Sequence, residues 1–110
     1  CSDLRNSKVK DVISELETYG VEMSIHDPVA LEKEIQAIYP YKSIAWDEIE
    51  DMDAIVLCVA HAYYCERSFL DYVQKLAPKG ARVIFDVKSI LNPSTSKEKL
   101  ALETLNLHRL

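Results

Sequence analysis

Two hydrophobic patterns alternate along this chain and predict its secondary structure. Apolar residues recur every three or four positions in some stretches, which is typical of helices packed on one face. Between them lie short apolar runs, and the strongest holds seven consecutive apolar residues between Asp53 and His61. A run this short and rich in β-branched residues predicts a strand buried on both faces. We therefore expect helices on both sides of a sheet built around this strand.

The expected elements follow one another in a regular order. Helices are predicted over residues 8–19, 29–38, 62–76 and 97–104. Strands are predicted over residues 21–25, 54–59 and 81–85, with weaker ones over 43–46 and 105–110. Alternation of this kind indicates βαβ units and a mainly parallel sheet. The predicted fold is a Rossmann-like α/β domain of three layers, α/β/α, spanning residues 1–110.

One feature of this order is unusual, because a doubly wound domain normally opens with its central strand. Here a helix comes first, after the polar residues 1–6. We expect that the first, central strand is missing and that the chain is a fragment of a longer one. The strand at Asp53–His61 would then border the resulting gap in the sheet.

Composition narrows the class of protein. A length of 110 residues suits one domain, and the net charge of −5 argues against non-specific nucleic-acid binding. No apolar run approaches the ~20 residues of a membrane span. The three cysteines form no zinc motif, and Cys58 inside the predicted strand is expected to be an inert core thiol. A reducing, cytoplasmic location and no metal are therefore expected.

Polar residues stand where the predicted strands end, and in a parallel sheet these ends meet at one edge. They are His26-Asp27, His61 and Asp86-Val87-Lys88, and Arg5 precedes a helix that starts at the same edge. Cations and helix starts together suit a phosphate group. The alternative is that Asp27 caps a helix and Lys88 is a solvated strand end. For His61, general acid–base chemistry competes with a hydrogen-bonded structural role.

Two absences restrict the chemistry further. The chain has only two glycines, Gly20 and Gly80, so neither a GxGxxG fingerprint nor a Walker A loop can form. No nucleophile stands beside a base, and Cys1 has no histidine nearby in the sequence. A Rossmann-like chain with these residues is not expected to bind a dinucleotide in the usual way or to be catalytic.

Several motifs together resemble the C-terminal domain of the UDP-glucose/GDP-mannose dehydrogenase family. They cover nearly the whole chain in the family's order, although each alone is short. They read Cys-Ser-Asp-Leu-Arg-Asn-Ser-Lys-Val from Cys1, Tyr19-Gly-Val-Glu, Ile25-His-Asp-Pro28, Asp53-Ala-Ile-Val-Leu-Cys-Val-Ala-His61, Phe85-Asp-Val-Lys-Ser-Ile-Leu91 and Leu107-His-Arg-Leu110. Ser2 stands where the family usually has proline, and position 89, here serine, is serine or glycine in the family.

The resemblance implies an enzyme that oxidises the C6 hydroxyl of a nucleotide sugar to a carboxylate for polysaccharide biosynthesis. Two NAD are used, and a cysteine-bound thiohemiacetal forms outside this chain. The Val-Ala-His and Asp-Val-Lys forms are similar to the branch acting on UDP-N-acetylhexosamines. By motif position, Lys88 would contact the UDP-sugar and Arg5 would reach toward NAD at the domain junction. The partners implied are the N-terminal domain, which binds NAD, and the central domain, in a homodimeric enzyme; this chain alone would be inactive.

Two other classes of function were weighed against this one. The first is a receiver-like signalling or interaction module, for which Asp86 would be the phosphoacceptor, although no acidic pair accompanies it. The second is a structural domain whose aromatic residues form an oligomer interface. The aromatic residues concerned are Tyr39, Tyr41, Trp46, Tyr63 and Tyr64.

Overall fold

The computed structural model describes residues 7–27 and 42–109. The chain forms two compact units, Cys1–Glu48 and Ile49–Leu110, and each is described by itself. Three features singled out from the sequence lie outside the described residues. They are the expected helix over residues 29–38, Arg5 and Cys1.

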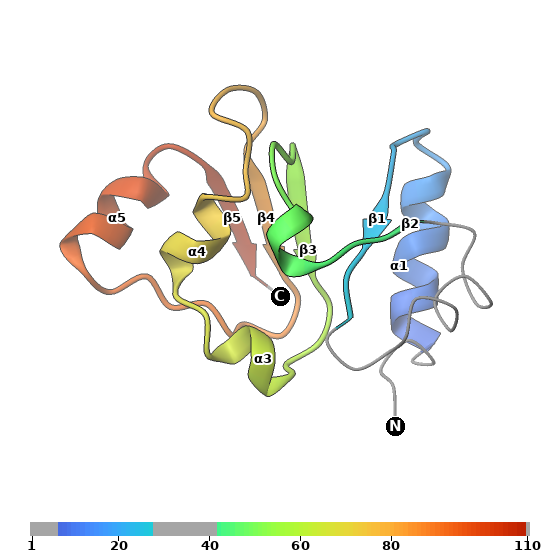
Figure 1. The fold of residues 1–110 in the computed structure, drawn as a ribbon, viewed down its shortest axis with the longest axis horizontal. Helices are drawn as coiled ribbons and strands as arrows, with labels where there is room; N and C mark the ends of the chain where they lie inside the picture. Colours follow the sequence, from blue (N-terminus) through green and yellow to red (C-terminus); the bar gives the residue numbers. More distant parts are fainter. Residues whose placement is uncertain (1–6, 28–41, 110) are drawn as a thin grey trace. The chain divides into compact units, whose positions relative to one another are not determined.

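The first unit holds a helix and a short parallel pair of strands (Figure 1). Helix α1, Ser7–Glu17, confirms the predicted helix, and Gly20 ends it with φ +68° and a 3.1 Å hydrogen bond from its N–H to the Glu17 carbonyl. Strand β1, Ser24–Ile25, is shorter than predicted and pairs in parallel with β2, Lys42–Ser43.

The weaker strand predicted over residues 43–46 is wrong at its carboxyl end. Residues Trp46–Glu48 form a 3₁₀ turn, η2, instead of continuing β2. The reason is local, because the Glu48 carboxylate accepts a 2.8 Å hydrogen bond from the Ala45 N–H and thereby caps the turn.

The second unit contains a three-stranded parallel sheet in the order β3–β4–β5. The strands are β3, Ala54–Leu57, β4, Val83–Asp86, and β5, Asn106–Arg109. Their register aligns Leu57, Asp86 and Arg109, so all three strands end at the same edge. We call this edge the carboxyl edge. Parallel strands joined by helical crossovers confirm the predicted Rossmann-like α/β class.

The single helix predicted over residues 62–76 is wrong, because two shorter helices occupy this stretch. They are α3, Ala62–Cys65, and α4, Phe69–Val73. Ser68 starts α4 through a capping box, in which its hydroxyl accepts from the Asp71 N–H and its own N–H donates to the Asp71 carboxylate at 2.8 Å. The last helix, α5, Ser96–Leu102, begins with a second capping box made by Thr95 and Glu98.

One face of this sheet carries the core of the second unit. Right-handed crossovers between strands in sequential order place α4 and α5 on the same face, and the two helices contact each other (Figure 1). Along β4, Ile84 and Asp86 point to a buried side and are 0% exposed, while Phe85 points the other way and is 40% exposed. The buried apolar residues of this unit are Leu57, Tyr64, Phe69, Tyr72, Leu76, Ile84 and Leu91.

The opposite face carries a ring stack across two strands. Phe85 on β4 is paired with His108 on β5, and their rings stack with centroids 5.0 Å apart and planes at 19°. Among the described strands, β3 has a neighbour on one side only, β4, and β1 and β2 form a separate sheet. The missing first strand stays a prediction.

Candidate ligand-binding edge

The carboxyl edge of the three-stranded sheet brings together two of the residues that the sequence singled out. Lys88 follows β4 by two positions and is exposed, and His61 lies in the connection from β3 to α3. The exposed Arg109 ends β5 at the same edge. His26 and Asp27 instead follow β1 in the other unit. The edge of the second unit therefore presents a lysine and an arginine, which suits an anionic ligand.

The loop that presents Lys88 is tightly tied to the sheet. We call residues 86–91 the β4 loop. The Val87 N–H donates to the Leu57 carbonyl at 3.0 Å, and the Ser89 N–H donates to the Asp86 carbonyl at 3.3 Å. Lys88 is therefore an inner residue of a turn whose two ends are both held by backbone hydrogen bonds.

Ser89 completes the reversal of the chain. Its φ is +54°, in the left-handed region that L-residues with a Cβ rarely adopt. Glycine enters this region without a steric penalty, so a glycine at position 89 would remove the backbone strain that serine carries there. Two residues on, Leu91 is 4% exposed and anchors the far end of the loop in the core.

His61 has a structural role in this fold. It is the N-cap of α3, and its Nδ1 atom accepts a 3.0 Å hydrogen bond from the Tyr63 N–H. Its ring also meets the Tyr64 ring edge-on, with centroids 6.4 Å apart. An Nδ1 atom that accepts a backbone hydrogen bond is not available as a base, so the structure supports the hydrogen-bonded role for His61.

A cation–π pair lies one turn further along and was not foreseen from the sequence. The Arg67 guanidinium carbon lies 4.1 Å from the centroid of the Tyr63 ring. A hydrogen bond with the Tyr63 side chain is the main cause that raises the pKa of Arg67 above its ordinary value, so the guanidinium stays charged. The four-residue spacing of Tyr63 and Arg67 could have predicted this contact, because side chains at i and i+4 meet on a helical turn.

The two thiols of the second unit, Cys58 and Cys65, differ in their burial. Burial raises the pKa of the Cys58 thiol above its ordinary value of 9.0, which disfavours the reactive thiolate. The sequence predicted an inert core thiol inside the strand; Cys58 instead follows β3 and is half-buried, so the core placement is wrong, while the raised pKa fits an unreactive thiol. The exposed Cys65 thiol donates a long, 3.7 Å contact to the Ala60 carbonyl.

The two alternative functions receive no support from these positions. A phosphoacceptor aspartate must be accessible, but Asp86 is 0% exposed and its carboxylate accepts two backbone hydrogen bonds. In the proposed tyrosine interface, Tyr64 is 7% exposed and belongs to the core, while Trp46 packs edge-on against His26 in the other unit. Tyr39 and Tyr41 lie outside the described residues.

Neither glycine forms part of a dinucleotide site. Gly20 ends α1, and a Cβ added there would meet no atom within 4 Å. Gly80 precedes β4, at the end of the sheet away from Lys88, and a Cβ there would be 3.8 Å from the Asp53 carboxylate. A fingerprint glycine is needed where backbone and pyrophosphate approach closely. These glycines do not fit that role, so no step of NAD chemistry is assigned to this chain.

These features define a class, namely a Rossmann-like α/β domain with cationic residues at its carboxyl edge and no glycine-rich loop. Comparison with known families makes the class specific. Residues 1–93 match the UDP binding domain of the UDP-glucose/GDP-mannose dehydrogenase family, and the chain belongs to this family. The family is one of NAD-dependent dehydrogenases, and the part of it that this chain matches is its UDP binding domain.

Three curated relatives agree with this assignment. The chain is 33% identical to Protein CapL of Staphylococcus aureus over 92 residues, which cover 84% of this chain and 21% of the relative. It is 29% and 27% identical to the UDP-N-acetyl-D-glucosamine 6-dehydrogenases of Pseudomonas aeruginosa and Salmonella typhi, in each case over 91% of this chain and 23% of the relative. The chain thus spans less than a quarter of the length of these relatives.

No solved structure matches the chain. Within residues 7–27 and 42–109, no helix is long and apolar enough to cross a membrane.

Proposed function

We propose that this chain is the UDP-sugar-binding domain of an NAD-dependent nucleotide-sugar 6-dehydrogenase. Such an enzyme oxidises a UDP-hexose or UDP-N-acetylhexosamine to the uronic acid for polysaccharide biosynthesis. The observation that carries the proposal is the family match over residues 1–93. The names of two relatives, both UDP-N-acetyl-D-glucosamine 6-dehydrogenases, favour the UDP-N-acetylhexosamine branch.

Lys88 is the residue proposed to contact the UDP-sugar. Its side chain is exposed at the carboxyl edge, where parallel α/β sheets bind their ligands. An ammonium group donates up to three hydrogen bonds and balances the charge of a diphosphate. The backbone of the β4 loop is held on both sides of Lys88, so little conformational freedom is lost when the ligand binds.

The chemistry of oxidation is proposed to reside in other domains of the same enzyme. NAD would bind mainly to the N-terminal domain, since the two glycines here do not fit a dinucleotide site. Burial raises the pKa of the Cys58 thiol and disfavours its thiolate, and this chain alone is proposed to be inactive. Arg5 as a contact to NAD, a homodimeric enzyme and a cytoplasmic location belong to the same proposal and rest on the family alone.

The direct test is calorimetric titration of the 110-residue chain with UDP. We expect binding that Lys88→Ala weakens about 10-fold or more, the effect of losing a hydrogen bond to a charged group. Lys79→Ala is the matched control, because Lys79 is also exposed but precedes β4 instead of following it. Equal affinities for wild type and Lys88→Ala would remove Lys88 from the site.

A second assay addresses catalysis. The chain is incubated with NAD and UDP-N-acetylglucosamine, and absorbance of NADH is followed. We expect no NADH, because a chain with two glycines cannot form a fingerprint loop for NAD. NADH production above the background without enzyme would show that the chain is catalytic by itself and would contradict the proposal.

A further inference from the structure

Asp86 is the most deeply buried charged residue described in the second unit, and it faces the loop that carries Lys88. It is 0% exposed. Its Oδ1 atom accepts a 3.0 Å hydrogen bond from the Ile90 N–H, and its Oδ2 atom accepts a 2.7 Å hydrogen bond from the Leu91 N–H. A buried carboxylate is stable only when such bonds replace water. Each oxygen therefore holds one amide on the far side of the turn.

These two bonds close the loop around Lys88. The chain leaves β4 at Asp86 and reverses its direction at Ser89, where φ is +54°. It then returns to Asp86, whose carboxylate accepts the hydrogen bond from the Ile90 N–H. Side-chain and backbone atoms of one residue thus bind the loop at Ser89, Ile90 and Leu91. Lys88 is enclosed in this cycle, while its own side chain remains exposed.

We infer that Asp86 is a positioning residue for ligand binding, which sets the backbone from which Lys88 reaches the diphosphate of the UDP-sugar. The inference rests on the proposed function. It adds a residue that does not touch the ligand and acts through Lys88. The pyrophosphate gains from a lysine held in one place, because ordering a mobile loop on binding would cost affinity.

A general structural role for Asp86 is the competing explanation, and the chain offers a matched control for it. Glu98 is also a buried carboxylate, 8% exposed, and it accepts backbone hydrogen bonds from Ser94 at 3.3 Å and Thr95 at 3.1 Å. It caps α5 and holds no part of the β4 loop. Both bonds go to the Oε1 atom, so Glu98→Gln removes a buried negative charge, as Asp86→Asn does, without altering the surroundings of Lys88.

The experiment measures UDP affinity for five forms of the 110-residue chain. They are wild type, Lys88→Ala, Asp86→Asn, the double variant of these two, and Glu98→Gln. In Asp86→Asn the remaining oxygen can keep one of the two backbone hydrogen bonds. The other is lost, because the new NH₂ group is a donor and faces a backbone N–H, which is also a donor. We expect Asp86→Asn to weaken UDP binding about 5- to 30-fold and Glu98→Gln to leave it within about twofold.

The double variant separates a positioning role from a structural one. If Asp86 acts through Lys88, the double variant binds UDP as weakly as Lys88→Ala alone, because the lysine that Asp86 positions is already absent. Effects that multiply in the double variant, or an Asp86→Asn chain with wild-type affinity, would overturn the inference while Lys88 keeps its role. A Lys88→Ala chain with wild-type affinity would instead overturn the proposed function, and this inference with it.

A measurement on the unaltered chain guards against an Asp86→Asn chain that fails to fold. Amide NMR relaxation should give Lys88, Ser89 and Ile90 order parameters near the rigid backbone value of about 0.85 without ligand. The amide protons of Ile90 and Leu91 should resonate downfield, as donors to a carboxylate do. Order parameters below about 0.6 in this loop would show that Asp86 does not hold it and would overturn the inference.

Discussion

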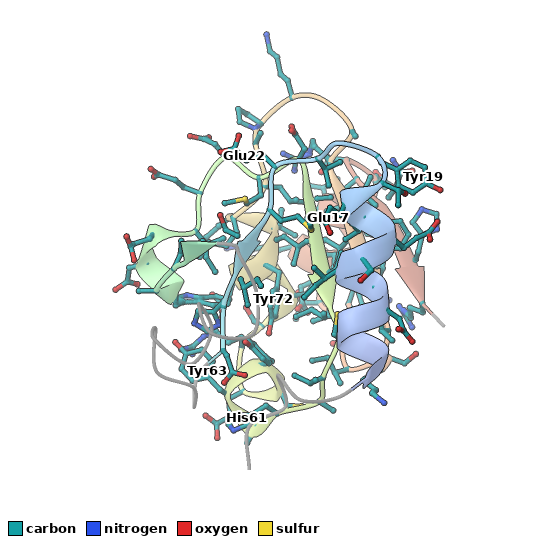
Figure 2. The ribbon with its side chains drawn as sticks, turned by 90° about the vertical axis from the view of Figure 1, so that its right-hand side faces the viewer. Glu17, Tyr19, Glu22, His61, Tyr63 and Tyr72 are labelled. Atoms are coloured by element: carbon teal, nitrogen blue, oxygen red, sulfur yellow. The ribbon has the colours of Figure 1, made fainter. Side chains whose placement is uncertain are left out.

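The buried hydroxyl of Tyr72 provides the sharpest test of how the second unit is held together. Tyr72, labelled in Figure 2, lies on α4 and is 1% exposed. Its hydroxyl donates a 2.6 Å hydrogen bond to the Tyr64 carbonyl in α3. This bond joins the two helices that replace the single predicted one. Tyr72→Phe removes the hydroxyl and retains the ring, so the lost hydrogen bond dominates the effect.

The loss of unfolding free energy expected for Tyr72→Phe depends on which hydrogen-bond donors the Tyr64 carbonyl keeps. A hydrogen bond contributes about 0.5–1.5 kcal/mol net, and leaving a buried carbonyl without a partner costs about 1–3 kcal/mol. Here the carbonyl keeps a weaker donor, the Arg67 N–H at 3.3 Å, so the full penalty does not apply. We expect Tyr72→Phe to lower the free energy of unfolding by about 1–1.5 kcal/mol.

Alkaline pH gives a second, independent readout of the same hydroxyl. Burial, the largest cause, raises the pKa of Tyr72 above its ordinary value of 10.0, so the folded chain holds this proton more tightly than the unfolded chain. The resulting stabilisation is complete below pH 10 and is lost as the pH rises above it. The stability advantage of wild type over Tyr72→Phe should therefore shrink above pH 10, by at most about 1.4 kcal/mol per pH unit.

The assay is urea denaturation followed by far-ultraviolet circular dichroism. Fluorescence is unsuitable because Trp46, the only tryptophan, lies in the other unit. Tyr19→Phe is the control, since Tyr19 is 71% exposed and its hydroxyl donates to the Glu15 carboxylate at 3.3 Å on the surface. A Tyr72→Phe cost no larger than that of Tyr19→Phe, or an advantage of wild type that persists unchanged above pH 10, would refute the reasoning.

Three further predictions concern the caps and the turn. His61→Ala should lower the free energy of unfolding by about 1 kcal/mol in urea titrations because the α3 cap is lost, whereas His61→Asn keeps an acceptor and should cost less; equal costs would exclude a capping role. Backbone hydrogen bonds from Thr95 and Ser94 lower the pKa of Glu98 below its ordinary 4.5, so the stabilisation by this carboxylate is present above pH 4.5 and lost as the pH falls. Between about pH 5 and pH 2 the free energy of unfolding should therefore fall less steeply for Glu98→Gln than for wild type, and equal slopes would contradict this. At Ser89, with φ +54°, a Val variant should unfold about 1–2 kcal/mol more easily than a Gly variant, and similar urea midpoints would argue against the left-handed turn.

Periodicity predicted the elements of this fold well and their interruptions poorly. The stripe at Phe69 and Val73 is apolar at helical spacing whether or not the helix begins at residue 62, so the pattern alone did not reveal the break. Ser68 and Asp71 did carry the signal, because serine followed three residues later by an acid is typical of a helix start. The same spacing at Thr95 and Glu98 marks the start of α5.

Part of the candidate site could likewise be predicted from the sequence and part could not. Strand-end logic placed Lys88 and His61 at one edge, since carboxyl ends of parallel strands meet regardless of side-chain detail. The direction of the Asp86 carboxylate was not readable, because it depends on a reversal at Ser89 that brings two later amides back to the strand. The cap formed by His61 could be inferred only once a helix start at residue 62 was known.

The cycle closed by Asp86 has a consequence for changing what this domain binds. Each carboxylate oxygen meets one particular amide, four and five residues further along the chain. Inserting or deleting a residue between them would present the wrong amides and leave a buried charge without hydrogen bonds. The length of this segment is therefore fixed by its hydrogen bonds, whereas the exposed side chain at position 88 can be exchanged without disturbing them. Redesign of ligand preference should accordingly exchange side chains at the tip and leave the number of residues unchanged.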